Sequence, residues 1–362
     1  MFKTNQIISP IAPPKVKITS RICHSLLACM IVLVSLGNAT HANTSANESE
    51  KAQALTKDDI KGLLVVVNKS DNSVSVIDTQ QQKIVNTLPT GKGPHELVAS
   101  SDGKIAVSTD FVGGDSLTVF NITEQKVERS ISLEKYPGPH GIQFLKEDKS
   151  VAFTSGKSAK LVVANIISGE IEAAIPTQQQ TSHMAAIDHG KGLAYVSNIR
   201  SNSISKTSLE NKRVLKQIKV EEMPEAIRLL KDGSELWYGA NKEGLVVVID
   251  PETEAKLAVF DGFSFPYRVL FSHSEKVALV PDFRHHDLRF FDVANKTEIG
   301  RLALEKDAGP QGITLHPSLD IAFLSLNLKN KIVAIDIHSQ RIIAEYPTGN
   351  NPDGIVFINA NN

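Results

Sequence analysis

The sequence has little cysteine, tryptophan or net charge, and these shortages exclude several kinds of protein. Only Cys23 and Cys29 occur in 362 residues, and both lie in one apolar segment near the N-terminus. A mature chain without that segment would have no cysteine, which excludes disulfides, thiolate zinc sites, iron–sulfur clusters, covalent haem attachment and a cysteine nucleophile. Basic and acidic residues number 39 and 40. This balance argues against nucleic-acid binding, because such proteins usually have a strong basic excess.

Residues 1–42 have the pattern of a secretory signal peptide. The apolar run "ICHSLLACMIVLVSLG" at 22–37 is preceded by cations and no acid, and it is followed by small residues; the cations are Lys3, Lys15, Lys17 and Arg21. The run is short for a transmembrane helix. We therefore predict cleavage after Ala42, a periplasmic or secreted protein, and no transmembrane segment in the mature chain. A lipoprotein anchored at Cys29 is the alternative, but the apolar run continues past that residue.

A short phrase recurs along the rest of the chain at a nearly constant interval. It appears as "GPHEL" and "GPHGI", and the positions equivalent to its proline are 42–45 residues apart: Pro94, Pro139, Ser182, Pro224, Pro266, Pro310 and Pro352. A period of about 40–45 residues is typical of β-propeller blades. Each unit contains four short runs rich in Val, Ile and Phe, separated by turn residues such as "SSDGK" at 100–104.

These repeats predict an all-β, seven-bladed β-propeller with four-stranded antiparallel blades. The inner strands are expected to begin near residues 95, 140, 183, 225, 267, 311 and 353. One strand follows Pro352, and three strands at 62–89 precede Pro94, so the C-terminal strand should complete the N-terminal blade and close the ring. The predicted organisation is a leader at 1–42, a flexible polar lead-in at 43–61 and the propeller at 62–362.

The segment "VVVNKSDNSVSVIDTQQQKIVNTLPTGKGPHELVASSDGKIAVSTD" at 65–110 resembles the YVTN-repeat family, which includes YncE-like periplasmic propellers. The resemblance extends over 62–358, and the unit at 183–221 departs from it with "SISKTSL". It implies the fold and an exported protein, but no particular activity. "GPHGI" and "GPQGI" resemble, more faintly, the metal-dependent streptogramin lyase propellers. No catalytic residue of that family has a secure match here.

In such a propeller the strand after the proline lines the central channel, and the first residue after the proline lies at the channel mouth. That position is polar in all seven units: His95, His140, His183, Glu225, Tyr267, Gln311 and Asp353. The following residues Glu96 and Arg268 are charged and join this set of candidate ligand-binding residues. A polar residue is also expected there for structural reasons alone, because the opening is narrow and wet.

Three consecutive units supply histidine at the mouth, and this suggests a metal site. His95, His140 and His183 are candidate ligands for a divalent transition metal, with a carboxylate from Glu96, Glu225 or Asp353 nearby. This ion is the one cofactor that the sequence suggests. Without a metal, the same imidazoles could hydrogen-bond a polar small molecule.

The loops between second and third strands should face the same way as the mouth, and six of them carry a cation: Lys69, Lys157, Arg200, Lys242, Arg284 and Lys329. Arg200, Arg284, His285 and His286 are candidates for a cationic rim that attracts anionic ligands. The alternative is an ordinary solvated loop surface. The Asn and Asp residues that end the second strands should hydrogen-bond their own turns, and histidines away from this face, including His316, should be structural.

We expect an exported, monomeric, non-catalytic binding or scaffold protein with a small-molecule or protein ligand at the mouth and its loops. The alternative is a metal-dependent lyase or lactonase-type hydrolase centred on the three histidines. Nucleic-acid binding is further disfavoured by the aromatic content of 6%, which leaves little for base stacking.

Overall fold

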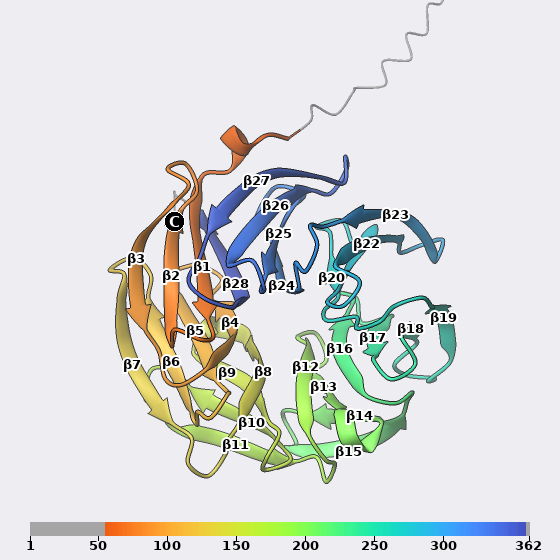
Figure 1. The fold of residues 1–362 in the computed structure, drawn as a ribbon. Coiled ribbons are helices and arrows are strands. Elements are labelled where there is room, and N and C mark those ends of the chain that lie inside the picture. Colours follow the sequence, from red (N-terminus) through yellow and green to blue (C-terminus); the bar gives the residue numbers. More distant parts are fainter. Residues whose placement is uncertain (1–54, 360–362) are drawn as a thin grey trace, which may run out of the picture. The chain divides into compact units, whose positions relative to one another are not determined.

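The computed structural model describes residues 55–359, which form seven four-stranded antiparallel sheets arranged in a ring (Figure 1). The predicted seven-bladed β-propeller is confirmed. The predicted leader at 1–42 and most of the lead-in lie outside the described residues. Between residues 55 and 359 there is no helix long and apolar enough to cross a membrane.

Each blade runs from an inner strand at the channel to an outer strand at the rim of the ring. The inner strands are β4 (Pro94–Ala99), β8 (Pro139–Phe144), β12 (Ser182–Asp188), β16 (Pro224–Leu229), β20 (Leu270–Phe271), β24 (Pro310–Leu315) and β28 (Pro352–Asn359). The second strands are β1 (Gly62–Asn68), β5 (Ile105–Asp110), β9 (Ser150–Ser155), β13 (Leu193–Asn198), β17 (Leu236–Ala240), β21 (Val277–Asp282) and β25 (Ile321–Leu326). The third strands are β2 (Ser73–Asp78), β6 (Ser116–Asn121), β10 (Lys160–Asn165), β14 (Ser203–Ser208), β18 (Leu245–Ile249), β22 (Asp287–Asp292) and β26 (Lys331–Asp336). The outer strands are β3 (Lys83–Pro89), β7 (Lys126–Ser132), β11 (Ile171–Pro176), β15 (Arg213–Lys219), β19 (Lys256–Phe260), β23 (Thr297–Ala303) and β27 (Arg341–Pro347). Short 3₁₀ turns occur at η1 (Lys57–Asp59), η2 (Lys146–Asp148) and η3 (Ile199–Ser201).

The two ends of the ring are joined as the sequence predicts. The C-terminal strand β28 pairs antiparallel with β1, from Gly62 opposite Asn359 to Val66 opposite Ile355. It becomes the inner strand of the blade whose other three strands come from the N-terminal part of the chain. Closure therefore satisfies an inner edge that β1 would otherwise expose.

The hydrophobic core is divided among the seven interfaces between neighbouring blades. One cluster joins Trp237 of β17 to Phe271 and Phe291 of the next blade, and the other six are built alike. Second and third strands are buried on both faces, which is why their sequences are nearly continuous apolar runs rather than alternating ones. The outer strands alternate exposed and half-buried residues because one face meets solvent.

A β-bulge follows the first residue in six of the inner strands, and it sets the shape of the mouth; that residue is proline in five of them and Ser182 in β12. In β4 the pairing shifts between Pro94 and Leu97, and equivalent shifts occur in the other five. A bulge re-aims the side chains of the residues inside it, here toward the propeller axis. The second bulge residue is glycine in three blades. A Cβ on Gly141 would lie 2.7 Å from Met184 Cα, and one on Gly354 would lie 2.6 Å from Leu97 N. These glycines therefore let neighbouring inner strands approach closely.

One inner strand differs from the expectation. The ladder of β20 begins at Leu270 rather than near residue 267, and the preceding segment keeps only an isolated bridge between Pro266 and Asp282. The partner position is Pro281, which has no N–H to donate to the inner strand. The carbonyl of Pro281 still accepts from Tyr267 N at 2.9 Å, so the mouth residue stays in place.

The lead-in was predicted to be flexible as far as residue 61, but its last part is packed against the propeller. Ile60 is fully buried in the cluster that joins β1 to β25 and β26. Thr79 Oγ1 donates to the carbonyls of Ile60 and Gly62 at 3.1 and 2.9 Å. The apolar side chain of Ile60 explains the difference, since it covers the end of that cluster.

His316 is structural, as expected, and it makes stability depend on pH. Its Nδ1 accepts the backbone N–H groups of Ser318 and Leu319 at 3.2 and 3.1 Å. Burial and the neighbouring His273 lower the pKa of His316 to about 4. The unfolded chain takes up this proton near pH 6.5, but the folded chain does so only near pH 4. The free energy of unfolding should therefore fall by up to about 3 kcal/mol through His316 as the pH drops from 6.5 to about 4.

Urea unfolding at several pH values between 7 and 4 tests this prediction. His316→Asn keeps an acceptor for the turn without a titrating ring, so it should flatten the pH dependence. Burial also lowers the pKa of His140 well below 6.5, so some loss should remain in this variant. His338→Asn is a suitable control, because that side chain is 65% exposed. An unchanged slope in His316→Asn would contradict the assignment.

Candidate functional site

The structure gathers the seven predicted mouth residues at one end of the channel. They come from the start of six inner strands and from the segment before β20, and all seven are buried: His95, His140, His183, Glu225, Tyr267, Gln311 and Asp353. Glu96 and Arg268 lie two positions after the proline of their blades, where the other blades have Gly, Ala or Met. These two long side chains therefore reach the axis and meet there.

The three histidines form a stack rather than a ring of ligands around one point. The centroids of His95 and His140 are 4.4 Å apart, and those of His140 and His183 are 3.7 Å apart. Phe111, at the end of β5, packs its edge against His140 at 4.7 Å. His183 Nε2 lies 2.7 Å from Glu225 Oε1, so this nitrogen is already engaged although the ring packs against His140.

An ion pair between Glu96 and Arg268 spans the channel next to the mouth residues, on the side toward the channel interior. Arg268 Nη2 donates to Glu96 Oε1, and Nη1 lies 4.0 Å from Glu225 Oε1. Burial alone would raise the pKa of Glu96, but the charge of Arg268 and the hydrogen bond from His95 lower it to about 2. Both Glu96 and Arg268 are therefore charged at neutral pH, and the guanidinium also packs over the Tyr267 ring at 4.2 Å.

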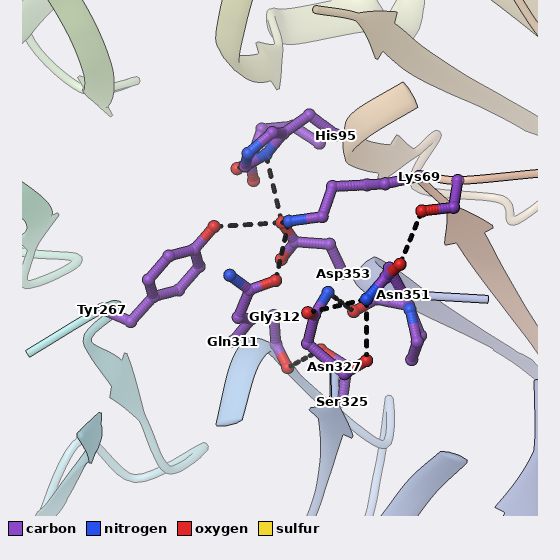
Figure 2. Close-up of polar contacts among 12 residues, drawn as sticks. Lys69, His95, Tyr267, Gln311, Gly312, Ser325, Asn327, Asn351 and Asp353 are labelled. Atoms are coloured by element: carbon purple, nitrogen blue, oxygen red, sulfur yellow. Dashed lines mark hydrogen bonds and ion pairs between the residues drawn. The ribbon is translucent and has the colours of Figure 1, made fainter. Parts of the chain in front are cut away.

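Asp353 is the centre of the remaining polar contacts (Figure 2). Its Oδ2 lies 3.0 Å from Lys69 Nζ, 3.0 Å from the Tyr267 hydroxyl and 3.2 Å from His95 Nδ1. Lys69 also donates to Gln311 Oε1 at 2.7 Å. Burial and the charge of Asp353 raise the pKa of Tyr267 well above 10, so its hydroxyl stays protonated and donates.

The mouth has spare capacity for a cation. Three carboxylates (Glu96, Glu225 and Asp353) face two cations (Arg268 and Lys69), and this leaves one negative charge before the histidines are counted. Among the described residues, His140 Nδ1 and Asp353 Oδ1 are buried without a hydrogen-bond partner. Burial and the neighbouring His183 and His95 lower the pKa of His140 well below 6.5, so its ring stays neutral and can offer a lone pair to a metal ion.

The residues that could hold a metal differ in part from the predicted set. Single donor atoms of His95, Glu96 and His140 lie within 4.8 Å of one another. His95 Nδ1 and His140 Nδ1 are 3.2 and 4.0 Å from Glu96 Oε1. His183 is outside this group because its Nε2 is bonded to Glu225. The structure thus offers a His–Glu–His set in place of three histidines.

The predicted rim residues lie in surface loops, where they have local partners. Arg200 is exposed in η3, and Arg284 is exposed and stacks 5.0 Å from the Phe265 ring. His285 Nδ1 is 3.1 Å from Asp282 Oδ2, and His286 Nδ1 accepts from Gly309 N at 3.3 Å. Asp282 Oδ1 accepts the N–H groups of Arg284 and His285 at 3.1 Å, so it orders its own turn as expected.

Two residues of the mouth were not predicted to lie there. Lys69 belonged to the predicted loop cations, but it folds inward to Asp353 instead of facing solvent. Phe111 follows β5 and covers two of the histidines. An aromatic residue directly after a second strand occurs again at Phe283. This recurrence could have indicated from the sequence that Phe111 lies near the mouth.

Comparisons with known proteins agree with the fold. Residues 43–150 match the model of a family described as YNCE-like beta-propeller. No curated protein matches the chain. A functionally unknown protein from Desulfotomaculum acetoxidans has a similar structure, with a TM-score of 0.70 and 14% identity over 83% of this chain and 99% of that one. Hydrazine synthase from Kuenenia stuttgartiensis is also similar in structure, with a TM-score of 0.67 and 15% identity over 76% of this chain and 93% of that one. At such identities the likeness to these structures concerns the fold alone.

Proposed function

This chain is a β-propeller of the YNCE-like type, and we propose that it is a non-catalytic binding protein that holds a divalent transition-metal ion at its channel mouth. One observation carries the proposal. His95, Glu96 and His140 converge within 4.8 Å while the buried His140 Nδ1 has no partner among residues 55–359. A buried imidazole nitrogen without a partner is costly unless something binds it.

The distances suit a small ion. Ligand atoms about 2.0–2.1 Å from a tetrahedral ion lie roughly 3.3 Å from one another. His95 Nδ1 and Glu96 Oε1 are already 3.2 Å apart, and His140 Nδ1, now 4.0 Å from Glu96 Oε1, needs to approach that oxygen by roughly 0.7 Å. Asp353, whose Oδ1 has no partner in the described part of the chain, is available as a fourth ligand, since its Oδ2 lies 3.2 Å from His95 Nδ1. Imidazole and carboxylate together favour zinc, copper, nickel or iron over calcium.

Metal content of the purified, tag-free protein tests the proposal. We expect about one equivalent of zinc or copper per chain after exposure to each ion, measured by elemental mass spectrometry. His140→Ala and Glu96→Gln should each weaken binding by more than about 100-fold, since even loss of an outer-shell partner costs about 10–100-fold. His183→Ala should retain the ion, because that imidazole is bonded to Glu225.

His338→Ala is the matched control, as this exposed histidine pairs only with Asp320 at 3.2 Å. Equal metal content in wild type and His140→Ala would overturn the site. Loss of the ion in His183→Ala alone would instead favour the three-histidine set. Absence of metal from every sample would leave a polar mouth whose ligand is a small molecule or a protein.

A metal-dependent hydrolase or lyase is the second candidate, and the three-ligand set favours it. Catalytic zinc sites typically have three protein ligands and one open position, whereas structural sites have four. Turnover of a lactone or ester that is lost with chelator and restored by one ion would establish this activity. No such turnover by metal-loaded protein would leave the binding role.

Export is part of the proposal and rests on the leader expected at 1–42. A metal-binding propeller in the periplasm or outside the cell would meet its ion and its partner there. Mass spectrometry of the mature N-terminus after expression with the leader measures this directly. Cleavage after Ala42 is the expected result, and an uncleaved chain in the cytoplasm would contradict it.

A further inference from the structure

Below the mouth, the channel holds a cavity of about 700 Å³ that shares only Glu96 with the proposed metal ligands. All seven inner strands or their flanking residues line it. Glu96 and Arg268 form its upper end, where their ion pair separates it from the histidines. Lys231 and His189, which follow β16 and β12, line it at the opposite end. The cavity is therefore reached from the face opposite the mouth.

One level of this cavity has an unusual composition. The pairing of inner with second strands identifies one equivalent residue in each blade: Val98, Gln143, Ala186, Arg228, Leu270, Thr314 and Val356. Four of these are apolar, as expected for packed inner strands. Gln143, Arg228 and Thr314 are polar, and they occupy alternate blades at the same height. All three line the cavity.

Arg228 is a cation with no protein partner at this level. Its side chain is accessible from the channel, and it makes no ion pair or side-chain hydrogen bond with any residue in the described range. Surrounding protein lowers the pKa of Arg228 by desolvation, which the charge of Glu275 partly offsets, but the guanidinium stays protonated at neutral pH. Glu275 is itself engaged, since it accepts the N–H of Lys231 at 3.0 Å. The only carboxylate that lines the cavity is Glu96, which is paired with Arg268.

The neighbours of Arg228 complete a small set of donors in an apolar wall. Gln143 Oε1 accepts the N–H of Ile187 at 3.1 Å, which fixes the amide and leaves its Nε2 as a donor. The Thr314 hydroxyl makes no hydrogen bond to another described residue and can donate as well. The surrounding wall is aliphatic, with Leu97, Ile142 and Ile355 among its residues. Pockets for small molecules combine such apolar walls with a few placed polar groups.

We propose that the channel binds a small organic monocarboxylic acid. The planar guanidinium of Arg228 matches a carboxylate with two parallel hydrogen bonds. Gln143 and Thr314 add donors at the same level of the channel, and the aliphatic residues of the wall cover the hydrocarbon part. The acid enters past Lys231, whose charge favours the approach of an anion. This site is distinct from the metal site proposed at the mouth.

Titration calorimetry with hexanoate tests the proposal, with hexan-1-ol and inorganic phosphate as comparators. Hexanol has the hydrocarbon without the charge, and phosphate has the charge without the hydrocarbon. We expect one hexanoate per chain with a dissociation constant of about 1 mM or lower, and at least about tenfold weaker binding of both comparators. Arg228→Gln should weaken hexanoate binding by at least about tenfold, as expected for loss of a charged hydrogen bond.

Arg213→Gln, an exposed arginine on β15, is the matched control and should bind hexanoate as wild type does. If Arg228→Gln fails to fold, Thr314→Val changes little volume and should weaken binding about three- to tenfold. No saturable binding to wild type, equal binding to Arg228→Gln, or hexanol binding as tight as hexanoate would each overturn the proposal. Tighter binding of phosphate would also overturn it, because the ligand would then lack the hydrocarbon part. Metal content is measured separately, so this result leaves the mouth proposal untouched.

Discussion

Replacing Arg268 with methionine should lower the free energy of unfolding by about 3–5 kcal/mol. The substitution leaves the Glu96 carboxylate without its main partner, and it removes the cation 4.0 Å from Glu225. Side-chain exposures of 10% for Arg268 and 13% for Glu96 make solvent a poor substitute. Breaking a buried pair from one side is costly because an uncompensated charge remains. Equilibrium unfolding in urea near neutral pH measures the change.

The double variant Glu96→Gln/Arg268→Met separates the charge effect from lost packing. It should recover at least about half of the lost free energy of unfolding, because replacing both charged groups with uncharged ones often changes stability little. Arg341→Met, on the exposed side of β27, should change stability by less than about 0.5 kcal/mol. A mutant cycle without coupling between residues 96 and 268 would contradict their role in closing the mouth.

Most of the fold follows from the repeat, because a propeller blade is a local structure. Four short strands joined by tight turns are specified within about 40 residues, and seven copies specify the ring. The lone strand after Pro352 also revealed the closure, since the first blade was one strand short. The exception was the inner strand at 267. There Pro281 on the partner strand has no backbone N–H to donate, and the pattern of apolar residues in the sequence does not reveal this loss.

The mouth could be predicted as a set of positions but not as a set of contacts. Counting from each proline gave the seven polar residues, and all of them are buried at one end of the channel. The sequence could not show that His183 pairs with Glu225, or that Lys69 reaches Asp353 across 284 residues. Such contacts depend on side-chain rotamers and on where the bulge aims each residue. For that reason the sequence predicted three histidine ligands, whereas in the structure the three rings pack against one another and the metal-ligating group contains Glu96 in place of His183.

Arg228 shows a different kind of limit. Its place in the sequence, inside an inner strand, suggests only an interruption of an apolar run. The register of seven separate strand pairs is needed to place it level with Gln143 and Thr314. The bulge adds to this difficulty, because its extra residue shifts the alternation of side chains between the two faces of the strand.

Removing residues 352–362 should abolish cooperative folding, the largest effect we expect. This truncation deletes β28, whose Ile355, Val356, Phe357 and Ile358 are all buried. At about 1.5–3 kcal/mol for each side chain the loss is about 6–12 kcal/mol, comparable to the whole stability of about 5–15 kcal/mol for a typical domain. It also exposes the inner edge of β1, which then invites aggregation. Circular dichroism and size-exclusion chromatography should show loss of the folded protein.

A circular permutant distinguishes the role of the strand from the mere loss of residues. Because Asn359 pairs with Gly62, residues 352–359 can be joined by a short turn ahead of Gly62, in a chain that ends at residue 351. This permutant has the same strand pairing with a different order along the chain, so it should fold and melt cooperatively. If both proteins fail, the connection near Ile60 rather than the pairing of β28 with β1 holds the ring closed. If the truncated chain folds alone, six complete blades and three strands are sufficient, and closure serves the channel instead of stability.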